Sequence, residues 1–148
     1  MTTNIRRYQQ VSKLLEDGVQ PFAITYNLVG LDFGTPNGPF EINGPAGKDG
    51  KVVAIHAHNV TEAFAVDTTE GLVHVGVSGT VNAYAISSNG VTDNAAISAL
   101  LDYDLGVGEG TLGNRIPADT AVIVTPIAGV DAGAEAGICT VSVTILWV

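Results

Sequence analysis

The chain has 148 residues, of which 46% are hydrophobic and only 14% are charged, and its formal net charge is −9. This length suits a single domain with a core of its own, and the negative charge argues against nucleic acid and anionic membranes as partners. A charged share well below the usual quarter or so suggests that other subunits cover part of the surface.

The first segment, residues 1–20, is expected to be an N-terminal arm or short helix, followed by one domain over residues 21–148. Val11 and Leu14 have helical spacing, and Gly18 stands where a C-terminal cap would lie. Such a segment can pack on its own core or dock on a neighbouring chain, and the sequence leaves both open. Its candidate contact residues are Arg6, Arg7 and Tyr8.

Short strands are expected from residue 22 onward. Residues 22–28 alternate apolar side chains with smaller or polar ones, as a half-buried strand does. The stretch 30–50 is rich in Gly, Pro and Asn, which predicts a long loop, with Phe33 and Phe40 as candidate contact residues. Further strand candidates, separated by turn residues, lie at 51–58, 60–66, 72–77, 80–86 and 95–103.

Two of these segments allow other interpretations. Residues 95–103 could instead begin a helix, since Ala and Leu favour helices and Asn94 could cap it. The stretch 71–92 carries no charged residue and is long enough to cross a bilayer, yet its polar residues and glycines exclude a membrane helix. We expect strands in both.

The final candidates, 118–127 and 138–148, are the most strand-like. In the last, Cys139 and the apolar residues at every second position point one way, while Thr and Ser point the other. Cys139, the single cysteine, is therefore expected to be a buried thiol. About eight short strands without intervening helices predict an all-β fold, an antiparallel β-sandwich of jelly-roll-like topology. An immunoglobulin-like sandwich is the second choice.

One motif suggests a metal. The spacing of Gly50, His56, His58 and Glu62 resembles the first motif of the cupins, in which two histidines and a glutamate bind a divalent metal inside a jelly roll. Spacing of i, i+2 on a strand does put both imidazoles on one face. However, the closing glycine of that motif would fall at Thr69, and a second motif is not visible. A cupin-like metal-binding protein is therefore the alternative, with His56, His58 and Glu62 as ligands.

Other chemistry has less support. Asp102, Asp104 and Glu109 could offer oxygen ligands to calcium, but a solvated turn explains them better. Because no serine lies in a nucleophile elbow and the glycines do not form a dinucleotide fingerprint, we do not expect an enzyme.

The segments 44–60, 71–85 and 116–148 together resemble the capsid cement proteins of tailed phages. The last of these has the pattern proline-alanine-aspartate-threonine, strand, Ala/Gly loop and final strand, whereas residues 1–43 match nothing in that family. The resemblance implies a non-enzymatic, cofactor-free protein on the capsid surface of a virion, made in the host cytoplasm. Its partners would be the major capsid protein and its own copies, as a dimer or trimer. A virion adhesion module that binds carbohydrate is a third possibility, with Phe33, Phe40 and Tyr103 as the candidate aromatics.

Overall fold

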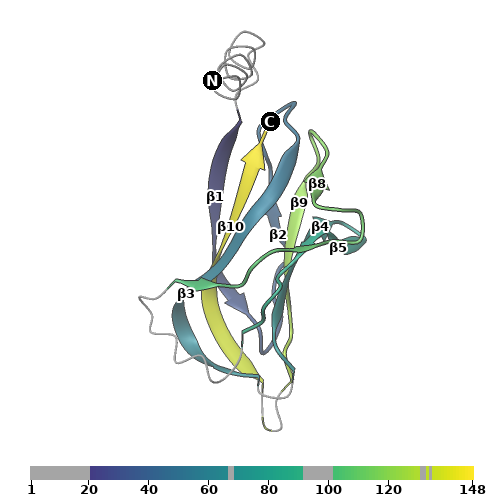
Figure 1. The fold of residues 1–148 in the computed structure, drawn as a ribbon. Helices are drawn as coiled ribbons and strands as arrows, with labels where there is room; N and C mark the ends of the chain where they lie inside the picture. The colour runs from purple at the N-terminus through teal and green to yellow at the C-terminus, as the bar shows by residue number, and fades with distance from the viewer. Residues whose placement is uncertain (1–20, 67–68, 92–101, 131–132, 134) are drawn as a thin grey trace, which may run out of the picture.

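The structure, a computed structural model, describes residues 21–66, 69–91, 102–130, 133 and 135–148 (Figure 1). Over these residues the chain is all-β, and two antiparallel sheets pack against each other. No helix long and apolar enough to cross a membrane occurs in this part of the chain. The strands are β1 (Phe22–Asp32), β2 (Phe40–Ile42), β3 (Gly50–Ala65), β4 (Leu72–Val77), β5 (Thr80–Ile86), β6 (Tyr103–Asp104), β7 (Gly108–Glu109), β8 (Arg115–Ile116), β9 (Val122–Ile127) and β10 (Ala136–Trp147).

The strand order confirms the jelly-roll-like sandwich. One sheet runs β1-β10-β3-β6, with β8 also paired to β3, and the other runs β2-β9-β4-β5-β7. The pairs β1·β10, β2·β9, β3·β8 and β4·β5 are nested, so the first strand pairs with the last and each inner pair follows in turn. A long antiparallel ribbon rolled over itself has this connectivity, and an immunoglobulin-like sandwich does not.

Several strand boundaries differ from the sequence-based expectation. Residues 51–58 and all of 60–66 except Val66 belong to a single strand, the 16-residue β3, which continues through Asn59 despite its positive φ of 50° and a register shift nearby. The expected loop at 30–50 contains the end of β1 and all of β2. The arm at 1–20 and most of the segment 95–103 lie outside the described residues.

The core lies between the sheets, and β10 supplies much of it. As the alternation predicted, Cys139, Val141, Val143, Ile145 and Trp147 are each at most 1% exposed. Next to the indole of Trp147 stand two glycines where a Cβ would collide with the ring, and the indole Nε1 donates a hydrogen bond to a tyrosine hydroxyl at 3.1 Å. These glycines are Gly44 and Gly50, and the tyrosine is Tyr26.

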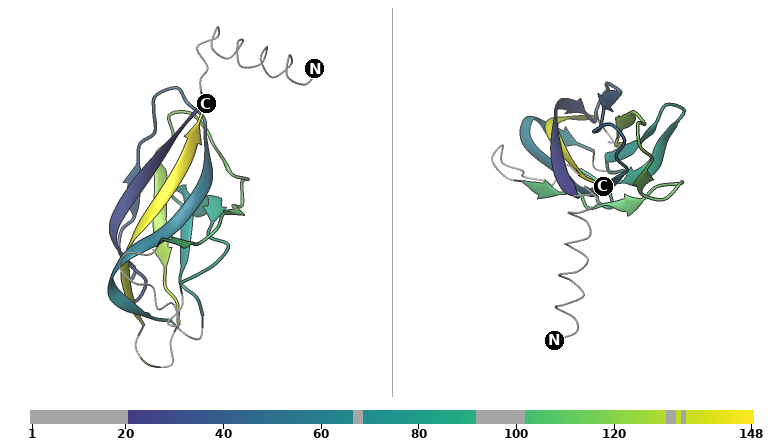
Figure 2. Two further views of the ribbon diagram at one scale, coloured as in Figure 1. Left: turned by 60° about the vertical axis from the view of Figure 1, so that its left-hand side comes forward. Right: turned by 90° about the horizontal axis from the view of Figure 1, so that it is seen from above.

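Two loops are tied together at the end of the sandwich where the chain terminates (Figure 2). The Asp49 carboxylate accepts a hydrogen bond from the Ala118 amide at 2.9 Å and pairs with Arg115. The Asp119 carboxylate accepts one from the Gly47 amide at 2.7 Å. Since each aspartate bridges one loop to the other, the connection β2–β3 and the connection β8–β9 form one body.

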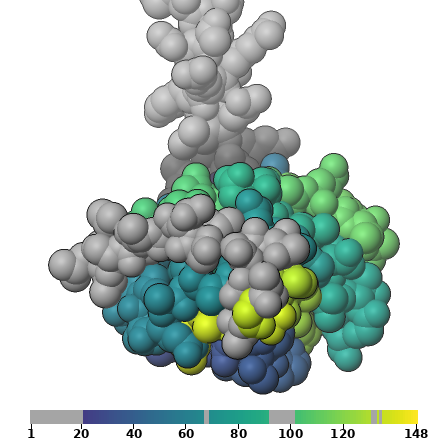
Figure 3. All heavy atoms as spheres, turned by 90° about the horizontal axis from the view of Figure 1, so that it is seen from below, coloured from purple at the N-terminus to yellow at the C-terminus, as the bar shows by residue number. Residues whose placement is uncertain are grey.

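At the opposite end, early and late parts of the chain meet. Figure 3 views this end and shows blue atoms of the β1–β2 region beside yellow atoms of β10. The Phe33 amide donates to the Gly137 carbonyl at 2.8 Å, and a Cβ on Gly34 would lie 2.6 Å from the Glu135 carbonyl oxygen. The turn after β1 is therefore packed directly on the start of β10.

Candidate functional site

The two histidines of the cupin-like motif lie on the outer face of the sheet β1-β10-β3. Their strand neighbours Ile55 and Ala57 are fully buried, so His56 and His58 point away from the core. His56 Nδ1 lies 2.7 Å from an oxygen of Asp102, and His58 Nε2 lies 2.6 Å from the Ser142 hydroxyl.

This geometry does not provide the interior metal site that the cupin resemblance implies. Glu62, the third expected ligand, is exposed on β3 opposite Ile138. In the described part of the chain, no three side chains of His, Cys, Asp or Glu gather closely enough to hold a metal ion. The acidic residues near the loop are engaged as well, since Asp102 bonds to His56 and Asp104 accepts from the Gly106 amide at 2.8 Å.

A row of polar side chains crosses the same outer face. The Ser142 hydroxyl on β10 donates to Asn27 Oδ1 on β1 at 2.6 Å, and His58 on β3 bonds to the Ser142 oxygen from the other side. One step along, the hydroxyls of Thr25 and Thr144 lie 2.9 Å apart. Cross-strand pairs of this kind join neighbouring strands in addition to the backbone ladder.

Ser142 and His58 are close enough to suggest a nucleophile and its base, but the hydroxyl hydrogen of Ser142 does not point to the imidazole. The hydroxyl hydrogen of Ser142 is directed to Asn27 Oδ1, so the imidazole donates to the serine oxygen and does not accept from it. A general base must instead receive the hydroxyl proton. In this arrangement the row of hydrogen bonds joins strands β3, β10 and β1 to one another.

The aromatic candidates prove to be mostly core residues. Phe33 is fully buried and meets the ring of Phe64 edge-on, with centroids 6.0 Å apart, so it is a core residue and not an exposed contact residue. Phe40 and Tyr103 are half-buried and pack against the core. The arm residues among the candidates, Arg6, Arg7 and Tyr8, lie outside the described residues.

The large apolar side chains that are exposed were not singled out from the sequence. In a strand, an apolar residue on the solvent side looks the same in the sequence as one on the core side, so periodicity offers little signal. Among the described residues they are Phe22, Val29, Val53, Val81, Leu112, Val130 and Val148.

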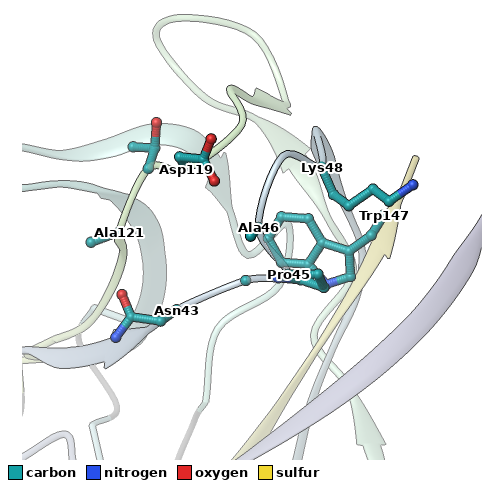
Figure 4. A pocket seen from close by; sticks show the side chains of 9 residues that line it. Asn43, Pro45, Ala46, Lys48, Asp119, Ala121 and Trp147 are labelled. Atoms are coloured by element: carbon teal, nitrogen blue, oxygen red, sulfur yellow. The ribbon is translucent and has the colours of Figure 1, made fainter.

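A small open hollow lies above Trp147, between the two bonded loops (Figure 4). Its volume of about 230 Å³ is below the range usual for small-molecule sites, about 300–1,000 Å³. Lys48 and Asp119 carry opposite charges at its rim, while the indole below is only 1% exposed. Because a sugar needs an open aromatic face for stacking, this hollow gives no support to a carbohydrate site.

A second hollow, of about 340 Å³, lies between the β1–β2 connection and the β4–β5 hairpin. It is mainly apolar, and its apolar lining residues are Pro36, Pro39, Val77, Val81 and Ile123.

No protein-family model matches the chain, and a search of curated proteins finds no match to it. The outer face of the sheet β1-β10-β3, in its β1 and β10 portion, presents small neutral side chains that are hydrogen-bonded to one another.

Proposed function

We propose that this protein is a non-enzymatic structural component of a virion, which binds the outer surface of the capsid and links neighbouring capsomers and its own copies. The resemblance of its sequence to the cement proteins of tailed phages suggests this role. The fold is compatible with it, since a jelly-roll-like sandwich offers broad, rigid faces without needing an active site.

The observation that best supports the proposal is the neutral outer face formed by β1 and β10, which we call the β1/β10 face. Its exposed or half-buried polar residues are Thr25, Asn27, Ser142 and Thr144, whereas Thr140 farther along β10 is only 4% exposed. Charged residues are depleted at the cores of protein interfaces, because burying a charge costs free energy unless the charge is paired. Although the chain has a net charge of −9, the β1/β10 face is free of charged residues, as the core of a protein interface usually is.

The internal hydrogen bonds of the β1/β10 face favour the same role. Asn27 and Ser142 already satisfy one another at 2.6 Å, so covering them leaves fewer polar groups without partners. Their rotamers are also held before any partner arrives, which lowers the entropic cost of association.

Co-sedimentation tests the proposal directly. Capsids of the phage that encodes this chain, assembled without it, are mixed with the purified full chain and pelleted. We expect saturable binding to the pellet and greater resistance of the loaded capsids to heat.

Two matched variants locate the contact. Asn27→Lys places a charge in the middle of the β1/β10 face. Burying this unpaired charge is expected to cost at least about 1.4 kcal/mol of binding free energy, which weakens binding at least tenfold. Leu112→Lys, at a side chain 70% exposed on the β7–β8 connection, is the control and should bind normally. A chain that stays in the supernatant with capsids at every concentration would contradict the proposal.

A further inference from the structure

Strand β1 is a long edge strand in the described part of the molecule. It pairs only with β10, and Figure 1 and the left view of Figure 2 both draw it at the margin of its sheet. The other strands at sheet margins, β2, β6, β7 and β8, are two or three residues long. Short edges are a common protection against pairing with another chain, whereas β1 has 11 residues.

The hydrogen-bond pattern shows which backbone groups of β1 face outward. The Leu105 amide donates to the Ile55 carbonyl on the far side of β3, so Val143, opposite Ile55, bonds to β1. Its partner Tyr26 therefore turns its backbone toward β10. On this alternation, the residues that turn N–H and C=O away from β10 are Ala23, Thr25 and Asn27.

This outward edge lacks the usual devices that prevent pairing. Residues 22–28 contain no charged residue and no proline. Beyond them the edge is closed by a side chain, since Asn37 donates to the Gly30 carbonyl at 2.7 Å and accepts from the Asp32 amide at 3.0 Å. The open part of the edge is therefore limited to residues 22–28.

We propose that β1 pairs with β1 of a second copy of this chain, antiparallel across a two-fold axis at Thr25, so that two sandwiches share one continuous sheet. In this register Thr25 faces Thr25 of the second copy, and the outward N–H and C=O groups of both strands bond to each other. The pairing is isologous, as a two-fold axis requires.

The side chains of β1 are self-complementary in this register. On the core side, Ile24 stands opposite Tyr26 of the second copy and Phe22 stands opposite Leu28. Ile24, Tyr26 and Leu28 are only half-buried in one chain, and Phe22 is 39% exposed, so the second strand would cover apolar surface that a single chain leaves in water. On the outer side, small Ala23 stands opposite the neutral Asn27, and no like charges meet.

This inference deepens the self-association part of the proposed function, and it does not depend on the capsid. A dimer through β1 can form in a protein that never touches a capsid, and a capsid-binding protein can remain a monomer. Solution mass and co-sedimentation therefore report on the two ideas separately.

Disulfide formation tests the register. Paired residues in a hydrogen-bonded antiparallel position have Cα atoms about 5.5 Å apart, within the range of about 4.4–6.8 Å that a disulfide spans. Thr25→Cys is therefore expected to give a disulfide-linked dimer under mild oxidation. Ala23→Cys is the control, because the two copies of residue 23 would be four residues apart along the strands, about 13 Å. Cys139 is 1% exposed and should not take part.

A second pair of variants tests the edge itself by measuring mass in solution. The full chain is expected to have twice the mass of one chain, and Thr25→Pro is expected to be a monomer, because proline removes an outward amide that β10 does not use. Thr25→Ser keeps the amide and should remain a dimer. Circular dichroism verifies that both variants are folded.

A dimer that cross-links at residue 25 and not at residue 23 supports the proposal, even if Thr25→Pro does not fold. A monomeric full chain, or an oligomer that fails to cross-link at residue 25, overturns it.

Discussion

Replacing Trp147 by alanine should remove one of the largest single contributions to the stability of the sandwich. The side chain is 1% exposed, packs beside Gly44 and Gly50, and donates a hydrogen bond to Tyr26. A buried aromatic side chain removes about 150–250 Å² from water, which at about 25 cal/mol per Å² amounts to roughly 4–6 kcal/mol. Measured costs of such truncations are about 3–5 kcal/mol, so we expect a loss of about 4 kcal/mol.

The loss of stability is measured by urea unfolding followed by circular dichroism, since Trp147 is the only tryptophan and the variant loses its fluorescence. At about 2–4 °C per kcal/mol for a chain of this size, the melting temperature should fall by roughly 8–16 °C. The control is Leu112→Ala, at a side chain 70% exposed, which should change stability by less than about 0.5 kcal/mol. A loss below about 1 kcal/mol for Trp147→Ala would mean that the indole does not hold this end of the core together.

Three further predictions concern titratable groups. The hydrogen bond from Arg115 holds the pKa of the Asp49 carboxyl below its usual value of 3.8, so the stability that this pair contributes is present at neutral pH and lost as the pH falls below about 4. Melting temperatures of the wild type and Asp49→Asn should therefore differ at pH 7 and converge as the pH falls through the lowered pKa of the folded carboxyl, and a constant difference would contradict this. Burial lowers the pKa of His74 below 6.5, so the folded state favours the neutral imidazole and loses stability on acidification through that range; an NMR titration midpoint at or above 6.5 would disprove it. Burial raises the pKa of the Cys139 thiol to about 12, so a thiol reagent at pH 7 should label it only after denaturant is added.

Much of the sandwich follows from its sequence because alternation is a direct record of which side faces the core. In β10 every second residue from Cys139 to Trp147 is apolar and buried, as the alternation predicts, although Thr140 on the other side is buried too and Leu146 there is apolar. A strand with one solvent-facing side and one core-facing side can be assigned in this way without knowing its neighbours.

Other features depend on partners that a local pattern does not contain. The three residues of β2 form a strand only because β9 lies beside them, and Asn59 interrupts the pattern of β3 without ending the strand. Phe33 stands in a Gly- and Pro-rich stretch that looks like a surface loop, yet Phe64 from β3 covers it. For the same reason the outward direction of His56 could not be read from its spacing, since i, i+2 places two residues on one face without saying which face.

An electron-microscopy map of the native particle tests the central proposal most directly. We predict density for this sandwich on the outer capsid surface, with the β1/β10 face against the shell and each copy spanning two capsomers. A particle in which the chain lies inside the shell, in the tail or nowhere would contradict the proposed function.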